Sequence, residues 1–483
     1  MVRFFFLLII GCYFFFATAS EFYAEEFDFG FLNEPQTEDT KPSNPTDYSS
    51  KNFKFNFTLE QSLRLNSKNS KIESLSIPLY FFDYWNNRLT LSTRLKIKFF
   101  DNLALNFYDR LNYLNDGDNR ISSAIVNNDI NELYLSYNIN SLNTFEAGRI
   151  NVKNGAAIGF NPTDFLKIYA GNEKVSDDPI VLRENRLGVL MARFQNINKF
   201  GSFSVIAVPH VNTRREKFLT TRGSFPLNLN KTNSSEKYLF KLETNIFNNI
   251  QPEILYLYER DKSGFGANIS TAIGDNIIAY AEWSGKKTYN ILMETILKYC
   301  YDYGISQDLP KTYLPDFIKK KKFKNQLSAG FSFAEKKYKR STFIEYHYNE
   351  NGLEKNYLKY ITESPYYNDV SPYFNELYLY QAYYYLFWAA RDNVNNLMEP
   401  YSKHQIFARN QWNEAFVNKL NLITMFQYNI LDKSFYTKFI TEYNCSSRLI
   451  LNASIVFYKG GILSEYGGLP ESYNVKLGCS IFF

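Results

Sequence analysis

The chain of 483 residues is poor in cysteine and histidine, with four of one and three of the other. Cys12 lies in the first apolar stretch, and the other cysteines are odd in number and far apart. This pattern excludes a disulfide framework and a zinc site, and the histidines are equally scattered. The sequence therefore predicts no metal centre and no cofactor. The residues are Cys300, Cys445 and Cys479, and His210, His347 and His404.

Long apolar runs are also missing beyond the first residues. The longest low-charge run, Leu377 to Ala390, is shorter than the roughly 20 residues that a transmembrane helix needs. The mean hydropathy is negative, which argues against a polytopic helical membrane protein. The formal net charge of +5 is mild and does not indicate a nucleic-acid partner. Aromatic residues, in contrast, make up 18% of the chain.

The first residues have the pattern of a secretory signal. Arg3 precedes the apolar run Phe4 to Phe16, and Ala17-Thr18-Ala19 offers small residues for cleavage. We expect a signal peptide over 1–19, with Cys12 as a lipoprotein site left as an alternative. The polar, acidic and proline-bearing residues 20–50 are expected to be a periplasmic lead-in, with filling of part of the lumen as the alternative.

From Phe53 onward the chain alternates with period two. The apolar residues Phe53, Phe55 and Phe57 are separated by Lys54 and Asn56, as in a strand with one apolar and one polar face. Similar segments recur throughout 51–483, without an internal repeat or a domain boundary. We expect strands near 53–65, 88–99, 103–113, 129–139, 143–150, 186–195, 200–208, 236–247, 250–259, 264–273, 276–284, 325–334, 339–349, 403–412, 418–429, 435–445, 448–458 and 472–483.

The connections between these segments alternate between short and long. Short turns, such as Asp101-Asn102 and Gly274-Asp275, alternate along the chain with long connections, such as 285–324 and 350–402. Transmembrane β-barrels have short periplasmic turns and long external loops. The sequence therefore predicts an all-β fold: a closed antiparallel transmembrane β-barrel of about eighteen strands.

The C-terminal segment strengthens this prediction. Apolar residues alternate with polar or small ones from Tyr473 through Gly478 and Ile481 to the terminal Phe483. The eight residues Lys476 to Phe483 resemble the C-terminal assembly signal of Gram-negative outer-membrane barrels. The resemblance implies insertion into the outer membrane by the barrel-assembly machinery, with Tyr473, Gly478, Ile481 and Phe483 as the recognised positions. Outer-membrane lipid and lipopolysaccharide would surround the barrel.

The polar face of the early strands is rich in basic residues. A charge on the lipid face is costly, so these side chains should point into the lumen or lie near an interface. Rings of lysine and arginine favour anions in pores. We therefore expect a pore-lining basic set, with solvation of the wall or lipopolysaccharide contact as the alternative. The set is Lys54, Arg64, Arg88, Arg94, Lys96, Lys98 and Arg110.

Alternation stops in the polar, glycine-containing stretch that begins at Gly148. Wide barrels often fold one long loop inward, so we predict a constriction loop here, with an ordinary external loop as the alternative. Its candidate residues are Arg149, Lys153, Asn161, Asp164, Arg183, Glu184 and Arg186. The segment Gly148 to Gly155 resembles the Gly-Arg-x-x-x-x-x-Gly segments of porin-like and alginate-export-type barrels, which implies polysaccharide export as a rival function.

Other features leave further alternatives open. Helix-like apolar runs at Tyr289 to Tyr303 and Leu377 to Val394 should pack on the lumen, the rim, lipid or a partner. Lys319 to Lys322 is expected near the upper rim, where anionic headgroups attract lysine. His347, near Glu345, together with His404 admits a hydrolase, which we rank low.

The sequence as a whole favours a porin, an outer-membrane channel for passive diffusion of small polar or anionic solutes, and no enzymatic activity. Export of an acidic polysaccharide and a surface-structural or adhesive barrel are the alternatives. Alternation patterns do not identify the solute, the pore radius or the oligomeric state. A homo-oligomer is one of the open alternatives.

Overall fold

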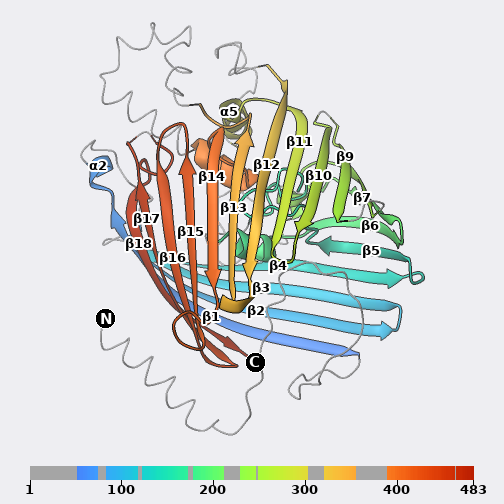
Figure 1. Cartoon of the computed structure of the whole chain (residues 1–483), viewed down its shortest axis with the longest axis horizontal. Helices are drawn as coiled ribbons and strands as arrows, with labels where there is room; N and C mark the ends of the chain where they lie inside the picture. Colours follow the sequence, from blue (N-terminus) through green and yellow to red (C-terminus); the bar gives the residue numbers. More distant parts are fainter. Residues whose placement is uncertain are drawn as a thin grey trace.

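The computed structural model describes residues 52–73, 83–117, 122–171, 178–211, 229–245, 249–260, 262–302, 320–354, 389–462 and 464–483. Within them, 18 strands form one antiparallel sheet that closes on itself, because β1 pairs with both β2 and β18 (Figure 1). The strands are β1 (Phe53–Lys68), β2 (Trp85–Phe100), β3 (Leu103–Gly117), β4 (Ser122–Asn138), β5 (Asn143–Ile150), β6 (Val189–Asn198), β7 (Gly201–Val208), β8 (Lys237–Thr244), β9 (Ile250–Tyr258), β10 (Gly264–Ile273), β11 (Ile277–Thr288), β12 (Lys322–Glu335), β13 (Arg340–Asn349), β14 (His404–Trp412), β15 (Leu420–Asn429), β16 (Phe435–Ser446), β17 (Leu449–Lys459) and β18 (Glu471–Phe482). The predicted barrel and its strand count are confirmed.

The outer surface of the barrel is apolar because alternate side chains point away from the lumen. On β8, for example, Tyr238 and Phe240 are exposed, while Leu239 between them is buried on the inner side. The same division holds on β18, where Leu477 is exposed and Asn474 is buried. In such a wall the backbone hydrogen bonds of every strand are made with its neighbours, and the outer face presents hydrocarbon to lipid. The chain is therefore a transmembrane β-barrel of the outer-membrane type.

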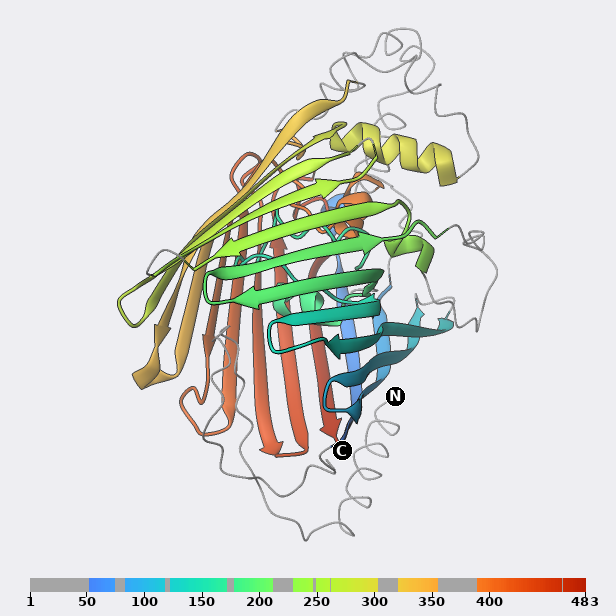
Figure 2. The ribbon, with the colours of Figure 1, turned by 90° about the vertical axis from the view of Figure 1, so that its right-hand side faces the viewer.

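The two ends of the barrel differ as the sequence predicts. Short turns such as 101–102 and 199–200 lie at one end, which we take as periplasmic, and connections such as 151–188 lie at the other. The wall is uneven in height, because β1 to β4 include strands of 15 to 17 residues while β5, β7 and β8 have eight. Figure 2 shows the short strands β5 to β8 facing the viewer, with β14 to β18 behind them.

Short helices lie in the external connections. They are α2 (Ser70–Glu73), α3 (Pro179–Asn185), α4 (Leu229–Thr232) and α5 (Ile291–Asp302), and η1 (Lys336–Tyr338) forms a periplasmic turn. The helix predicted over Tyr289 to Tyr303 is confirmed by α5. Residues 389–397 are also helical, whereas 377–388 lie outside the described residues. None of the helices in the described ranges is long and apolar enough to cross a membrane.

The external helices pack over part of the barrel mouth. Ile291 and Leu292 of α5 are buried with Val394 and Leu397 of the second external helix. Tyr169, from the connection between β5 and β6, packs against this cluster, and its amide donates to the carbonyl of Asn396 at 2.7 Å. The expected signal peptide and lead-in, 1–19 and 20–50, lie outside the described residues.

Candidate functional site

The connection 151–188 between β5 and β6 folds into the barrel. Its Phe165 and Leu166 are buried in a cluster with inward-facing residues of β6 to β9, such as Met191, Ile206 and Leu255. The upper inner wall is therefore apolar in this sector, and the connection covers it. We call residues 151–188 the inner loop; its residues 172–177 are outside the described part of the chain.

The tip of the inner loop is bound by two buried carboxylates of the opposite wall. Glu282 of β11 accepts a hydrogen bond from the amide of Ala157 at 2.6 Å, and Thr163 donates its hydroxyl proton to the same carboxylate at 3.1 Å. Glu345 of β13 accepts from the amides of Ile158 at 2.6 Å and Gly159 at 2.9 Å. These side chains satisfy loop amides that water would otherwise have to satisfy.

Glycine is required at the tip because the wall comes so close. A Cβ at Gly155 would meet the Glu282 carboxylate, and the backbone there has φ of +85°, which favours glycine. A Cβ at Gly159 would meet the rings of His347 at 2.6 Å and Phe407 at 2.7 Å. The glycines of this stretch therefore allow the backbone to lie directly on the wall.

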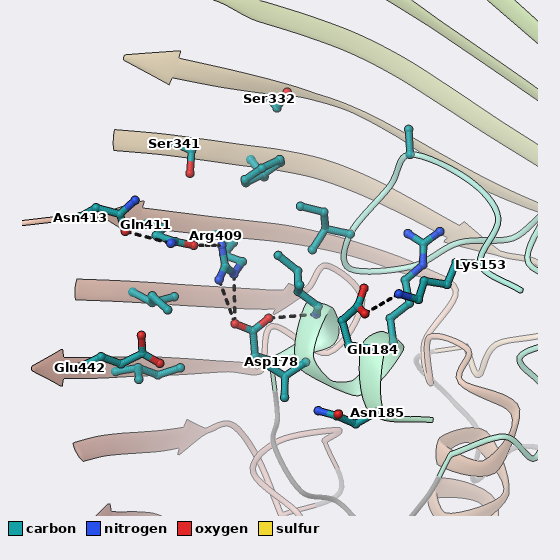
Figure 3. Close-up of a pocket in the computed structure, with 18 of the residues that line it drawn as sticks. Lys153, Asp178, Glu184, Asn185, Ser332, Ser341, Arg409, Gln411, Asn413 and Glu442 are labelled. Atoms are coloured by element: carbon teal, nitrogen blue, oxygen red, sulfur yellow. Dashed lines mark hydrogen bonds and ion pairs between the residues drawn. The ribbon is translucent and has the colours of Figure 1, made fainter. Parts of the chain in front are cut away.

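Helix α3 extends across the lumen between two walls. At its N-terminus Asp178 accepts from the amide of Ile180 at 3.0 Å and pairs with Arg409 of β14 at 3.0 Å. At its C-terminus Asn185 accepts from the hydroxyl of Tyr108 on β3 at 2.6 Å. Figure 3 shows Asp178 directed at Arg409, with Glu184 and Asn185 on the same short helix. The helix is thus held at both ends.

A bulge in β4 supports the C-terminal end of α3. Asn131 is skipped by the pairing of β3 with β4, and its side chain is buried. Its side-chain amide nitrogen donates to the backbone carbonyl of Asn185 at 2.7 Å, and its backbone carbonyl accepts from the amide of Gly188 at 2.8 Å. Bulges commonly redirect one side chain in this way.

The seven candidates of the predicted constriction loop lie in one substructure, in two environments. Arg186 and Asp164 form a buried ion pair at 2.7 Å, and Arg149 donates to the carbonyl of Gly188 at 3.0 Å. Asn161 is also buried, and donates to the carbonyl of Ala157. These four side chains hold the loop together. The remaining three, Lys153, Arg183 and Glu184, line the open cavity.

All three of these lumen-facing residues have fixed partners. Lys153 forms an ion pair with Glu184, and both side chains are about a third exposed, at 34% and 32%. Arg183 donates to the carbonyls of Asn154 at 2.8 Å and Gly155 at 2.9 Å. The guanidinium group therefore ties α3 to the loop tip, while the ion pair lies beside the passage.

The cavity beside α3 has a volume of about 2400 Å³. Ten basic and eight acidic side chains contribute to its lining, from the inner loop with α3 and from strands around the barrel, β8, β9 and β11 included. Of the predicted basic set, Arg88, Arg94 and Arg110 line it. The guanidinium of Arg94 lies 4.3 Å from the ring centroid of Tyr108, and Arg110 pairs with Glu60 at 3.3 Å.

The other four predicted basic residues lie above or below this cavity. Lys54 pairs with Lys96 across β1 and β2, next to the pair of Asn56 with the cavity-lining Arg94. Lys54, Lys96 and Lys98 are exposed toward the periplasmic end of the inward-facing positions. Arg64 lies toward the external end of β1, half-buried.

A buried lysine lies within the inner loop, close enough to Glu399 of an external loop to be influenced by its charge. Lys167 donates to the carbonyl of Asn161 at 2.5 Å and lies 4.3 Å from the Phe160 ring centroid. Burial lowers the pKa of Lys167 to about 8, against the opposing effect of Glu399. Burial acts to raise the pKa of Glu399 itself, but Lys286 and Lys167 outweigh it and hold that pKa below its usual value.

The histidines considered for hydrolysis lie on different faces of the wall. His347 is buried toward the lumen, where its Nε2 lies 2.7 Å from Glu345. His404 contacts Tyr346 and Tyr348, the outward-facing neighbours of His347 on β13. The wall therefore separates the two imidazoles. In the described ranges no group of three or more metal-ligating side chains gathers.

Several residues of the site were missed because their partners are distant in sequence. Glu282, Tyr280 and Asp178 carried no motif, and Glu345 was considered for another role. Tyr280 donates to Glu345 at 2.7 Å, beside the bonds from the loop tip. A signal existed in the position of Glu282 and Glu345, since both are acidic residues in otherwise uncharged stretches of strand.

No protein-family model matches this chain, and no curated protein matches it. Solved structures with a similar outline include OccK8 (OprE) of Pseudomonas aeruginosa, at 8% identity and TM-score 0.48, covering 90% of this chain and 98% of that one. OccK5 (OpdH) of the same organism has 7% identity and a TM-score of 0.47, with 90% of this chain and 98% of that one covered. OccAB4 of Acinetobacter baumannii has 8% identity and a TM-score of 0.47, with 89% of this chain and 98% of that one covered. The assignment as an outer-membrane barrel rests on the strand pairing and apolar outer face described above.

Proposed function

We propose that this protein is an outer-membrane channel for passive diffusion of small polar or anionic solutes. The observation that carries the proposal is the cavity of about 2400 Å³ lined by charged side chains inside a closed wall. A barrel of this strand number is wide enough for an aqueous lumen. The inner loop leaves part of that lumen open, and the proposal involves no catalytic step.

The path for solute lies on one side of α3. The inner loop fills the sector in front of β6 to β9, and α3 is held by Arg409 on β14 and Tyr108 on β3. The strands between these two anchors, β15 to β18 with β1 and β2, face the open side of the helix. Solute would pass between α3 and these strands, with Lys153 and Glu184 at the narrowing.

The charges that line the cavity favour anions because most of its carboxylates have fixed cationic or amide partners. Asp178 is held by Arg409, Glu253 by Lys241 at 2.5 Å, and Glu282 by the loop tip. Arg94, in contrast, is exposed, and its guanidinium group lies over the ring of Tyr108. Exposed cations along a pore select for anions. Lys96 and Lys98 would continue this preference toward the periplasm.

The test is conductance of the refolded protein in planar bilayers, with a salt gradient to give the zero-current potential. We expect a stable conductance with anion preference. Absence of conductance would contradict the proposal that the barrel is a channel. Conductance with cation preference would support a channel but contradict the role given to the basic residues.

We propose separately that Tyr473, Gly478, Ile481 and Phe483 are read by the barrel-assembly machinery. Phe483 is exposed next to β18, and its ring lies 5.4 Å from that of Phe57 on the closing strand. Deletion of Phe483 should reduce insertion in cells while leaving refolding into detergent unchanged. Equal insertion of the deleted and complete chains would contradict this role.

A further inference from the structure

The outward face of β8 to β12 carries a row of aromatic side chains toward its external end. The Phe240 and Tyr256 rings lie 6.3 Å apart, and the Tyr256 and Phe265 rings 5.1 Å apart. The row continues with Phe323, which is half exposed and lies over Gly285, where a Cβ would meet its ring. Aromatic belts of this kind mark the level of the lipid headgroups.

Cationic side chains lie at the external end of this row. Lys287 pairs with Phe323 across β11 and β12 and, like Trp283 on the same strand face, is exposed. Lys321 precedes β12, with its ammonium group 5.2 Å from the ring centroid of Tyr289. Arg260 is exposed in the connection between β9 and β10. In Figure 2 these strands run side by side, and α5 lies beside their external ends.

The described acidic residues of the same region have other partners. Glu236, exposed just before β8, accepts a hydrogen bond from the Tyr238 hydroxyl. Glu259 bonds Ser235 and lies 4.0 Å from Lys237. Glu294 of α5 bonds Thr288 and lies 3.9 Å from Lys262. Among the described residues, no ion pair involves Arg260, Lys287 or Lys321. The rim above the aromatic row therefore presents positive charge at the height of the lipid phosphates.

We propose that Arg260, Lys287 and Lys321 form a binding site for the phosphorylated headgroup of an outer-leaflet glycolipid. Phe323, Trp283 and Phe265 would pack on its acyl chains, while the cations bind its phosphates. Cations near a lipid surface attract anionic headgroups, and several together act additively. The requirement for both an aromatic platform and overlying cations distinguishes this site from one for free phosphate.

Cations also lie elsewhere on the rim. On the far wall Lys459 ends β17 above Phe457 and Tyr473, and the ammonium group of Lys71 donates to the carbonyl of the neighbouring Gly460 at 2.9 Å. At the periplasmic end, Lys199 lies 4.9 Å from the Phe200 ring and Lys337 5.3 Å from the Tyr338 ring. These two reproduce the lysine-on-ring contact of Lys321 on the leaflet that lacks the glycolipid, and they supply a matched control.

The experiment is native mass spectrometry of the complete chain in detergent, titrated with bisphosphorylated lipid A. The triple variant Arg260→Gln, Lys287→Gln, Lys321→Gln should bind about a hundredfold more weakly, since each cation contributes roughly a fivefold effect. The control Lys199→Gln, Lys337→Gln should bind as the unchanged chain does. Folding of each variant is checked by heat-dependent electrophoretic mobility, and the single variants replace the triple one if it does not fold.

Two further arms identify the ligand chemistry. Dephosphorylated lipid A should bind weakly, and inorganic phosphate should fail to displace the complete lipid. Equal binding by the triple variant, an equal loss in the control, or equal binding of dephosphorylated lipid would overturn the proposal. Displacement by inorganic phosphate would overturn it too, because the site would then be one for a free anion.

Discussion

Arg409 of β14 pairs with Asp178 in the lumen, at 3.0 Å between guanidinium and carboxylate, and both side chains are almost fully buried. The same carboxylate caps α3 by accepting the amide proton of Ile180. One side chain thus starts the helix and attaches it to the wall. The inner loop therefore has a defined position across the pore.

Arg409→Gln should release the N-terminal end of α3. Loss of the guanidinium leaves Asp178 buried without its cation, which typically costs about 3 kcal/mol of unfolding free energy. We expect lower resistance to guanidinium chloride and noisier single-channel current, measured in parallel.

The control for this variant is Lys339→Gln, which removes an exposed ion pair with Glu414 in periplasmic turns. Exposed pairs contribute about 0–1 kcal/mol, so this variant should keep both properties. A quiet, unchanged current in Arg409→Gln would show that the pair does not hold the helix.

Gly155→Ala should displace the tip of the inner loop. The new methyl group would meet the Glu282 carboxylate, and φ of +85° disfavours any residue with a Cβ. We expect a larger conductance because the tip would leave the wall. Gly171→Ala in the same loop is the control, since its Cβ would meet only the carbonyl of Asn395, at 3.8 Å. Identical conductance in both variants would count against anchoring of the tip by Glu282.

Arg94→Gln should reduce anion preference. Its guanidinium lies on Tyr108 beside the passage, and removal of one such charge should lower the anion-to-cation permeability ratio about twofold. The zero-current potential in a potassium chloride gradient measures this ratio. Lys337→Gln makes the same charge change in the exposed turn formed by η1, so its ratio should not change. An equal shift in both variants would indicate a general charge effect.

Glu465 should make stability depend on pH. It lies in the external connection 460–470, where burial raises its pKa to about 7; Asp432 adds to the effect, while Arg391 and Gln405 oppose it. Between its ordinary pKa of about 4.5 and 7, the folded chain holds a proton that the unfolded chain has lost. The resulting stabilisation is complete below pH 4.5 and is lost as pH rises through 7.

Glu465→Gln should flatten this dependence, since glutamine does not titrate and can still bind Gln405 and Asn429. The unchanged chain should lose up to about 3 kcal/mol of unfolding free energy from pH 4.5 to 8, from the size of the shift. Chemical unfolding at several pH values measures the difference. Parallel curves for the two chains would contradict a raised pKa at Glu465.

The barrel could be predicted from sequence because its alternation is local. Phe53 to Leu65 and Leu89 to Phe99 alternate clearly, and β1 and β2 lie where expected. The segment near 186–195 was less distinct. Val189 and Met191 of β6 are apolar on the inner face, since they pack against the inner loop, so alternation cannot separate the two faces there.

The candidate site could be predicted only in part. The break in alternation after Gly148 identified the segment whose seven candidates the structure brings together. The pattern could not tell that Arg186 pairs with Asp164 in the interior of the loop while Lys153 and Glu184 face the cavity. It also could not place Glu282 and Glu345 against the tip, because alternation gives the face of a strand residue and neither its height nor its partner.

The most direct test of the channel is the zero-current potential of the complete barrel across a planar bilayer with a salt gradient. The account predicts open-channel current with a potential of the sign for anion preference, reduced in Arg94→Gln. A bilayer that remains non-conducting after verified insertion would contradict it.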